Sequence, residues 1–154
     1  MKIKYLAEIS IILLSRDDEE INNVLIRSAN AGILDTNKDN RIAALKISQA
    51  FVDTWTSCAE AVKIASMGML DTDSDVRSRA SEVLNGATKF INNVKENSNH
   101  NIRIQILELL KVLVKDRKSL DVAKEIMGKA INDEDNSVRR KAEELRTIIE
   151  SFNF

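Results

Sequence analysis

Four acidic residues in the stretch LDTDSDVRSRASE have a spacing that could bind a cation. Asp71, Asp73, Asp75 and Glu82 occupy positions 1, 3, 5 and 12 of a twelve-residue window, as the acidic ligands of an EF-hand calcium loop do. Such a loop needs glycine at position 6, where the chain turns sharply. Position 6 here is Val76, a β-branched residue that disfavours positive φ. We therefore do not expect a calcium site.

The same acids have a simpler use at the start of a helix. Asp73 stands three residues before Val76, from which apolar residues recur at helical spacing. Asp135, Asn37 and Asn99 occupy the corresponding position in other parts of the chain. Aspartate and asparagine are good N-cap residues, and a cap stabilises a helix by about 1 kcal/mol. The pattern predicts four capped helices.

The remaining residue types favour no catalytic or cofactor chemistry. The chain has one histidine, His100, and one cysteine, Cys58, so a zinc cluster is not expected. It also has no glycine-rich phosphate loop or nucleophile motif. Cys58 lies in a helical pattern as a small buried hydrophobe, and a lone cysteine fits a reducing compartment. We expect a cytoplasmic protein that is not an enzyme and needs no cofactor or metal.

Composition and periodicity predict an all-α protein. The 154 residues are 44% hydrophobic and 31% charged, with no proline, four glycines and a net charge of −1. Apolar residues recur at intervals of three and four, as on one face of a helix. The first apolar run is interrupted by Glu8 and followed by SRDDEE, so it is read as a first helix rather than a signal peptide. No apolar run is long enough to span a bilayer. The expected helices are 3–14, 18–34, 38–54, 57–70, 74–94 (with Gly86 as a candidate break), 99–115, 119–131 and 136–151.

An internal repeat is the strongest signal in the sequence. Residues 31–47 match residues 67–83 at an offset of 36. A third copy covers 131–145, and a weaker fourth covers 96–110. The matched pairs of the first two copies are Gly32/Gly68, Leu34/Leu70, Asp35/Asp71, Thr36/Thr72, Asp39/Asp75, Arg41/Arg77 and Ala44/Ala80.

The motif arginines show that one repeat is irregular. Arg41, Arg77, Arg103 and Arg139 are spaced by 36, 26 and 36 residues. The short middle interval leaves two alternatives. The third unit has a stunted first helix over Ala87–Lys95, or it shares a long helix with the second unit.

The pattern Asp-x-x-x-x-Val-Arg-x-x-Ala at this period resembles the HEAT repeat over roughly residues 18–151. The resemblance implies a right-handed α-α superhelix of about four antiparallel helix pairs, capped by an N-terminal helix, as a single domain over residues 1–154. It also implies a structural ladder between turn aspartates and second-helix arginines: Asp35, Asp71, Asp133, Arg41, Arg77, Arg103 and Arg139. Asn40, Asn97 and the missing proline depart from the family pattern.

In that family the second helices line a concave face, which suggests where a partner would bind. A helical wheel places Ile42 and Ile104 toward this face, where solvent-exposed polar residues are expected. One interpretation is that these side chains contact neighbouring helices; the other is a mixed apolar and charged groove for a partner helix or peptide. The candidate partner-binding residues are Ile42, Leu45, Lys46, Gln49, Glu82, Ile104, Glu108, Lys111 and Arg140.

The leading functional hypothesis is a non-enzymatic protein–protein interaction scaffold, with homo-oligomerisation left open and no membrane role. The alternative is a nucleic-acid-binding HEAT-like protein, such as a DNA-glycosylase-like enzyme with a basic groove. Its basic clusters are modest and balanced by the acidic run Asp17–Glu20, so solvated helix ends explain them as well. These clusters are Lys111, Lys115, Arg117, Lys118 and Arg139–Lys141.

Overall fold

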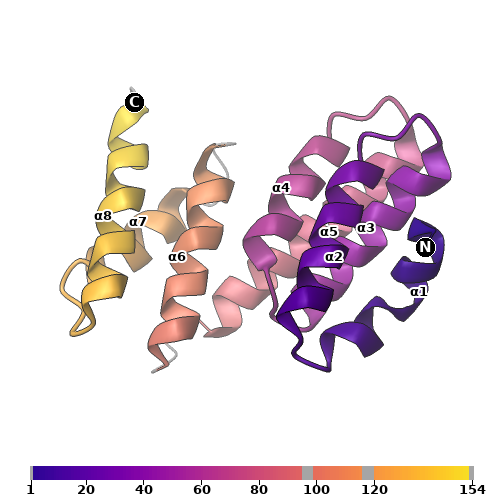
Figure 1. The fold of residues 1–154 in the computed structure, drawn as a ribbon. Helices are drawn as coiled ribbons and strands as arrows, with labels where there is room; N and C mark the ends of the chain where they lie inside the picture. Colours follow the sequence, from indigo (N-terminus) through magenta and orange to yellow (C-terminus); the bar gives the residue numbers. More distant parts are fainter. Residues whose placement is uncertain (1, 95–98, 116–119, 153–154) are drawn as a thin grey trace. The chain divides into compact units, whose positions relative to one another are not determined.

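The computed structural model describes residues 2–94, 99–115 and 120–152 (Figure 1). Within this part of the chain the protein consists of eight helices and has no strand, which confirms the all-α class. The helices are α1 (Ile3–Leu14), α2 (Glu19–Gly32), α3 (Lys38–Asp53), α4 (Cys58–Gly68), α5 (Ser74–Val94), α6 (His100–Lys115), α7 (Leu120–Ala130) and α8 (Asn136–Ser151).

Each expected helix is present, and its ends lie within two residues of the predicted ends. The candidate break at Gly86 is wrong, because α5 runs through this residue without interruption. A Cβ atom at Gly86 would lie 3.0 Å from Cγ1 of Val52, so the glycine lets α5 approach α3 closely. Ala87 continues α5, and a separate short helix does not begin there. Lys95 lies outside the described residues.

The predicted N-caps are confirmed. Asn37 Oδ1 accepts a hydrogen bond from the backbone N–H of Asp39 at 2.8 Å, and Asn99 Oδ1 accepts one from Asn101 at 2.9 Å. Asp73 and Asp135 each accept two such bonds, from the N–H groups two and three residues further along the chain. These bonds satisfy donors that have no partner inside the helix.

The chain divides into two compact units: Met1–Ala87, here called the N-terminal unit, and Thr88–Phe154, here called the C-terminal unit. The sequence predicts one domain over residues 1–154, and the structure divides this span in two. The boundary falls within α5, beside the irregular 26-residue interval between the motif arginines.

In the N-terminal unit, α3 is the central helix. It packs against α1, α2 and α4, and α1 also packs against α2. The first part of α5 buries Val76, Ala80 and Val83. Burying an aliphatic or aromatic side chain of this kind stabilises the fold by roughly 1.5–3 kcal/mol. The largest fully buried side chains of this unit are Leu25, Leu45, Ile47, Phe51, Val62 and Ile64.

Two glycines at matching repeat positions bring helices close together. A Cβ at Gly68 would lie 3.0 Å from Cβ of Ala80, and a Cβ at Gly32 would lie 3.2 Å from Cβ of Ala44. Distances this short are uncommon for a real Cβ atom, so an alanine at either position would force its neighbour to shift. The repeated glycine–alanine pair therefore sets how closely α2 approaches α3 and α4 approaches α5.

The C-terminal unit packs α8 against both α6 and α7, and α6 against α7. Its central side chains are fully buried, as the apolar spacing predicts. Ala130 of α7 occupies the repeat position that glycine holds in the N-terminal unit, and it is 7% exposed. The buried side chains include Ile106, Leu107, Leu109, Leu110, Val138, Ala142 and Leu145.

Candidate functional site

The joint between the first two repeats is an arginine–aspartate pair. Arg41 of α3 donates from Nε to Oδ2 of Asp71 at 2.8 Å and from Nη2 to Oδ1 at 3.3 Å. The two side chains are only 16% and 12% exposed. Arg41 also donates from Nη1 to the carbonyls of Asp35 and Thr36. One guanidinium thus links the turn before its own helix to the turn of the next repeat.

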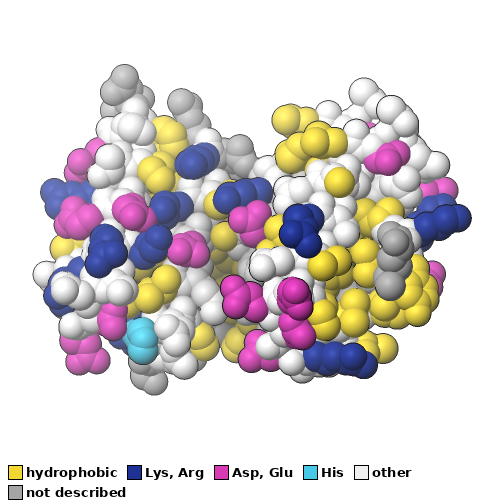
Figure 2. All heavy atoms as spheres, in the orientation of Figure 1, with side chains coloured by type: hydrophobic (Ala, Val, Ile, Leu, Met, Phe, Trp, Pro, Cys, Tyr) yellow, Lys and Arg dark blue, Asp and Glu magenta, His cyan; other side chains and the backbone are white. Residues whose placement is uncertain are grey.

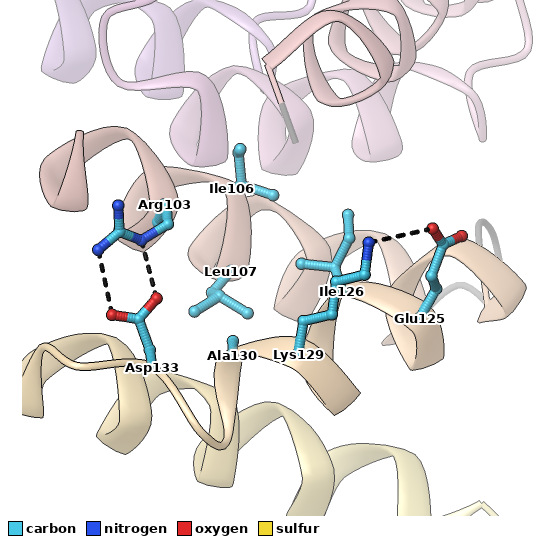
Figure 3. A pocket seen from close by; sticks show the side chains of 8 residues that line it. All are labelled: Arg103, Ile106, Leu107, Glu125, Ile126, Lys129, Ala130 and Asp133. Carbon is cyan, nitrogen blue, oxygen red and sulfur yellow. Dashed lines mark hydrogen bonds and ion pairs between the residues drawn. The ribbon is translucent and has the colours of Figure 1, made fainter. Parts of the chain in front are cut away.

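The same bidentate pair recurs in the C-terminal unit. Arg103 of α6 donates from Nη2 to Oδ1 of Asp133 at 3.1 Å, and its Nε lies 2.8 Å from Oδ2 in an ion pair (Figure 3). Burial alone would raise the pKa of Asp133, but the N–H of Asp135 and the Arg103 guanidinium lower it below its usual value. The carboxylate therefore stays charged within the joint.

The other predicted ladder residues bind the backbone of these turns. Arg77 donates to the carbonyl of Asp71 at 2.8 Å, and Arg139 donates to that of Asp133 at 2.6 Å. Asp35 accepts a hydrogen bond from the N–H of Asn37 at 2.7 Å. The ladder residues therefore lie at the turns and have structural partners.

The acidic stretch that resembled a calcium loop is occupied by such contacts. Asp71 binds Arg41, Asp73 caps α5, and Asp75 pairs with Lys38 at 3.0 Å. Val76 is completely buried in the first turn of α5. Among the described residues, no group of three or more histidine, cysteine, aspartate or glutamate side chains is placed to hold a metal ion.

A groove lies along the N-terminal unit where side chains of α1, α3 and α5 meet. It has a volume of about 150 Å³. Ile11 contributes an apolar side chain that is 54% exposed. The groove is lined by Ala7, Glu8, Ser10, Ile11, Leu45, Lys46, Gln49, Ala50, Asp53, Arg79, Glu82 and Val83.

A second hollow of about 240 Å³ shares Ala7, Glu8 and Lys46 with this groove. Ile42 lines it, together with Lys4, Asp39 and Ala43. We call the groove and this adjoining hollow the α1–α3–α5 groove. Five of the nine candidate partner-binding residues line it: Ile42, Leu45, Lys46, Gln49 and Glu82.

These five residues differ in the solvent exposure of their side chains and therefore in their accessibility to a partner. Lys46 and Glu82 are exposed, and Ile42 and Gln49 are half-buried. Leu45 is only 1% exposed, so its side chain belongs to the core rather than to an open surface. The reason is that Leu45 packs within 3.4 Å of the Cβ position at Gly68 of α4.

The other candidate residues lie in the C-terminal unit, where ion pairs join α6 to α8. Lys111 pairs with Glu144 at 2.7 Å, and Lys141 pairs with Glu108 at 3.2 Å and with Glu144 at 3.5 Å. The hydrogen bond from Lys111 lowers the pKa of Glu144, and the one to Glu108 raises the pKa of Lys141. We call these four residues the α6–α8 ion-pair network.

The network gives this face both signs of charge. Figure 2 shows acidic and basic side chains interspersed over α6 and α8. Glu108 and Lys111, two of the candidate partner-binding residues, bind within the protein, while Ile104 is half-buried and Arg140 is exposed. Lys115 is also exposed, and Arg117 and Lys118 lie outside the described residues.

A small pocket lies between α6 and α7 beside the Arg103–Asp133 pair (Figure 3). Its volume is about 70 Å³. Ile106 and Ile126 line it, and Lys129 on its edge reaches Glu125 at 4.0 Å.

The two residues with reactive side chains have ordinary surroundings. Cys58 is 3% exposed at the start of α4, and burial raises the pKa of its thiol to about 11. A thiol with this pKa is a poor nucleophile at neutral pH. His100 is the first residue of α6 and is exposed.

Sequence reasoning missed the part that α1 plays in the groove. Glu8 and Ile11 line it, and so does Arg79 of α5. The first helix carries no copy of the repeat motif, so comparison of the copies could not place it. The sequence nevertheless contained a signal. The buried residues Leu6, Ser10 and Leu14 recur at intervals of four, and the apolar residues Ile11 and Ile12 lie off the face that they form.

In comparisons with protein-family models, curated proteins and solved structures, nothing matched this chain. A search of the described residues for a helix that is both long and apolar enough to cross a membrane found none.

Proposed function

We propose that the protein is a HEAT-like α-solenoid that acts as a non-enzymatic scaffold in the cytoplasm. The repeated joint supports the first part of this proposal. Arg41–Asp71 and Arg103–Asp133 have the same separation in sequence and the same Nε–Oδ2 distance of 2.8 Å. Each pair links one repeat turn to the next, which is the contact that a stacked repeat requires.

We further propose that the α1–α3–α5 groove binds a helix or extended peptide of a partner protein. The observation that carries this proposal is the composition of its lining. Ile11 provides an exposed apolar contact, and Glu8, Lys46 and Glu82 place charges of both signs around it. An amphipathic helix binds such a surface by its apolar side, with charged residues setting register and specificity.

The α6–α8 face fits this role less well. Its lysines already have carboxylate partners at 2.7 to 3.5 Å. A partner would have to replace these ion pairs before it gained contacts of its own. The ion pairs at the groove, Arg79–Glu82 at 3.9 Å and Lys4–Asp39 at 3.5 Å, are at least as long and are more exposed, so replacing them costs less free energy. The proposal therefore places binding on the N-terminal unit.

The test is affinity purification from the native host with matched variants. Ile11→Asp should abolish recovery of the partner, because it places a charge against the partner's apolar side. Lys46→Glu should weaken recovery by reversing a charge in the groove. Ile12→Asp is the control, because Ile12 is the next residue on α1, is 60% exposed and points roughly 100° away from Ile11.

Ile104→Asp in the C-terminal unit is a second control and should leave partner recovery unchanged. All variants must first give the far-ultraviolet circular dichroism of the unmodified protein. Recovery that survives Ile11→Asp but is lost with Ile104→Asp would transfer the binding site to the other unit and refute the groove proposal.

A further inference from the structure

The outer side of α1 carries a stripe of side chains at coiled-coil spacing. Tyr5, Ile9 and Ile12 of α1 follow one another at intervals of four and three residues, and Arg16 lies four residues further on, in the turn after the helix ends at Leu14. Tyr5 is 53% exposed, Ile12 is 60% exposed, Ile9 is half-buried and Arg16 is exposed. We call these four residues the α1 stripe. Figure 2 shows hydrophobic side chains gathered on the surface over α1 and the neighbouring end of α2.

The stripe is held in place by the opposite side of the helix. Leu6, Ser10 and Leu14 are buried, and α1 packs against α2 and α3. An isolated helix of 12 residues would be marginal in water. Here the protein core supports the helix, so its outer side is presented as a preformed surface. Exposed apolar side chains in such an arrangement mark an interaction site.

Charge is distributed unevenly along this surface. Lys2 and Lys4 lie at the beginning of α1, with Lys4 at 3.5 Å from Asp39, and the acidic run Asp17–Glu20 follows Arg16 after its end. Asp18 is fixed there because it caps α2, accepting hydrogen bonds from Glu20 and Ile21. A second copy of this surface in antiparallel orientation would set each basic end against an acidic end. A parallel copy would set like charges together.

We propose that two copies of this chain associate through the α1 stripe as an antiparallel, two-fold symmetric dimer. In antiparallel coiled coils the two seam positions of one helix face the opposite seam positions of the other. Ile9 then packs against Ile12 of the other copy. Tyr5 lies against the turn that follows α1 of the other copy, where the guanidinium of Arg16 stacks on its ring, and Lys2 lies toward the acidic run Asp17–Glu20. Two-fold symmetry forms every contact twice.

A hollow beside the stripe would be covered in the same dimer. It lies between α1 and α2, has a volume of about 330 Å³ and is mainly apolar. Val24, which lines it, is 40% exposed. The dimer leaves Ile11 free, because this residue points into the α1–α3–α5 groove on another side of the helix. Dimerisation and partner binding are therefore separate properties.

The first test is sedimentation equilibrium of the full chain over a wide concentration range. We expect a reversible monomer–dimer equilibrium. Ile12→Asp should weaken it roughly 100-fold, because each dimer would bury two uncompensated charges. Ile11→Asp is the matched control and should leave the equilibrium unchanged. An unmodified protein that stays monomeric at every accessible concentration would overturn the proposal, as would equal effects of the two variants.

The second test measures orientation by cysteine cross-linking at concentrations where the protein is dimeric. Tyr5→Cys combined with Arg16→Cys should oxidise to a covalent dimer, because the two positions face each other. Tyr5→Cys alone should not, since the two copies of residue 5 would be roughly 16 Å apart at 1.5 Å per residue. The buried thiol of Cys58 gives little background. Efficient cross-linking through Tyr5→Cys alone would show a parallel pair and refute the antiparallel arrangement.

Discussion

The two units share one joint but differ in the surface beside it. Arg41–Asp71 in the N-terminal unit and Arg103–Asp133 in the C-terminal unit have the same Nε–Oδ2 distance of 2.8 Å and similar burial. The second helices of the C-terminal unit are tied together by the α6–α8 ion-pair network. The N-terminal unit instead has an open groove, part of whose lining comes from α1.

This difference distinguishes the residues that recur in the repeat copies from the residues that vary between them. The turn aspartate, the arginine and the buried alanine recur because they make the joint between helices. The face residues carry no such requirement, so their ion pairs differ between the units. Those of the α6–α8 ion-pair network are mostly shorter and less exposed, and those at the groove are longer and more exposed. The unit whose face charges are more loosely paired is the better candidate for binding a partner.

The largest expected effect comes from removing the joint charge in either unit. Asp71→Asn and Asp133→Asn should each lower the free energy of unfolding by about 2–4 kcal/mol, because a largely buried guanidinium loses its carboxylate. Urea denaturation measures the loss, and hydrogen exchange shows which unit opens. Asp75→Asn is the control, since this carboxylate is 68% exposed and its loss should change little. Equal effects of all three variants would show that the joint has no special energetic role.

The next prediction compares a closely packed glycine of the N-terminal unit with an open glycine of the C-terminal unit. Gly68→Ala should destabilise by about 1–3 kcal/mol, because the new methyl group meets Ala80 and Leu45. Gly128→Ala in α7 should stabilise by about 0.5–1 kcal/mol, because nothing lies within 4 Å of its Cβ position and alanine is the better helix former. Thermal unfolding of the two variants checks the signs. Stabilisation by both would mean that the glycine–alanine contact is loose.

Acid should weaken the C-terminal unit through Asp133 and Glu144. Both have a pKa lowered in the folded state, so their stabilisation is full above the unfolded pKa values of about 4 and is lost as pH falls through the folded values. Urea midpoints measured between about pH 6 and pH 3 should therefore fall. Glu144→Gln should flatten this dependence, and an unchanged slope would contradict the assignment.

The smallest effect concerns the ion-pair network itself. Lys141→Gln should cost about 0.3–1 kcal/mol, because its side chain is 29% exposed and water screens the attraction. The difference from the unmodified protein should shrink as salt is added. If the variant instead bound proteins that the unmodified protein does not bind, the ion pairs of Lys141 alone would be what keeps partners from this face.

Local features of the structure could be predicted from the sequence. Helix ends follow from capping residues such as Asp73 and Asp135, and the repeat identifies Arg41 and Arg103 at their joints. These features depend on residues a few positions apart, where spacing and side-chain type determine geometry.

Features that depend on distant helices could not be predicted in the same way. The helical wheel placed Leu45 on the partner-binding face, but contact with α4 buries it. The pairing of Lys111 with Glu144 requires knowing that α6 lies beside α8. The same holds for two other features, because both depend on which helices pack together. These are the division into two units and the contribution of α1 to the groove.

Site-specific photo-cross-linking tests the central claim most directly. A photoreactive amino acid would replace Lys46 in the groove or, as the matched control, Thr147 on the exposed side of α8, in cells of the native host. The account predicts a discrete protein adduct from position 46 that disappears with Ile11→Asp, and no such adduct from position 147. An adduct from position 147 alone would contradict it.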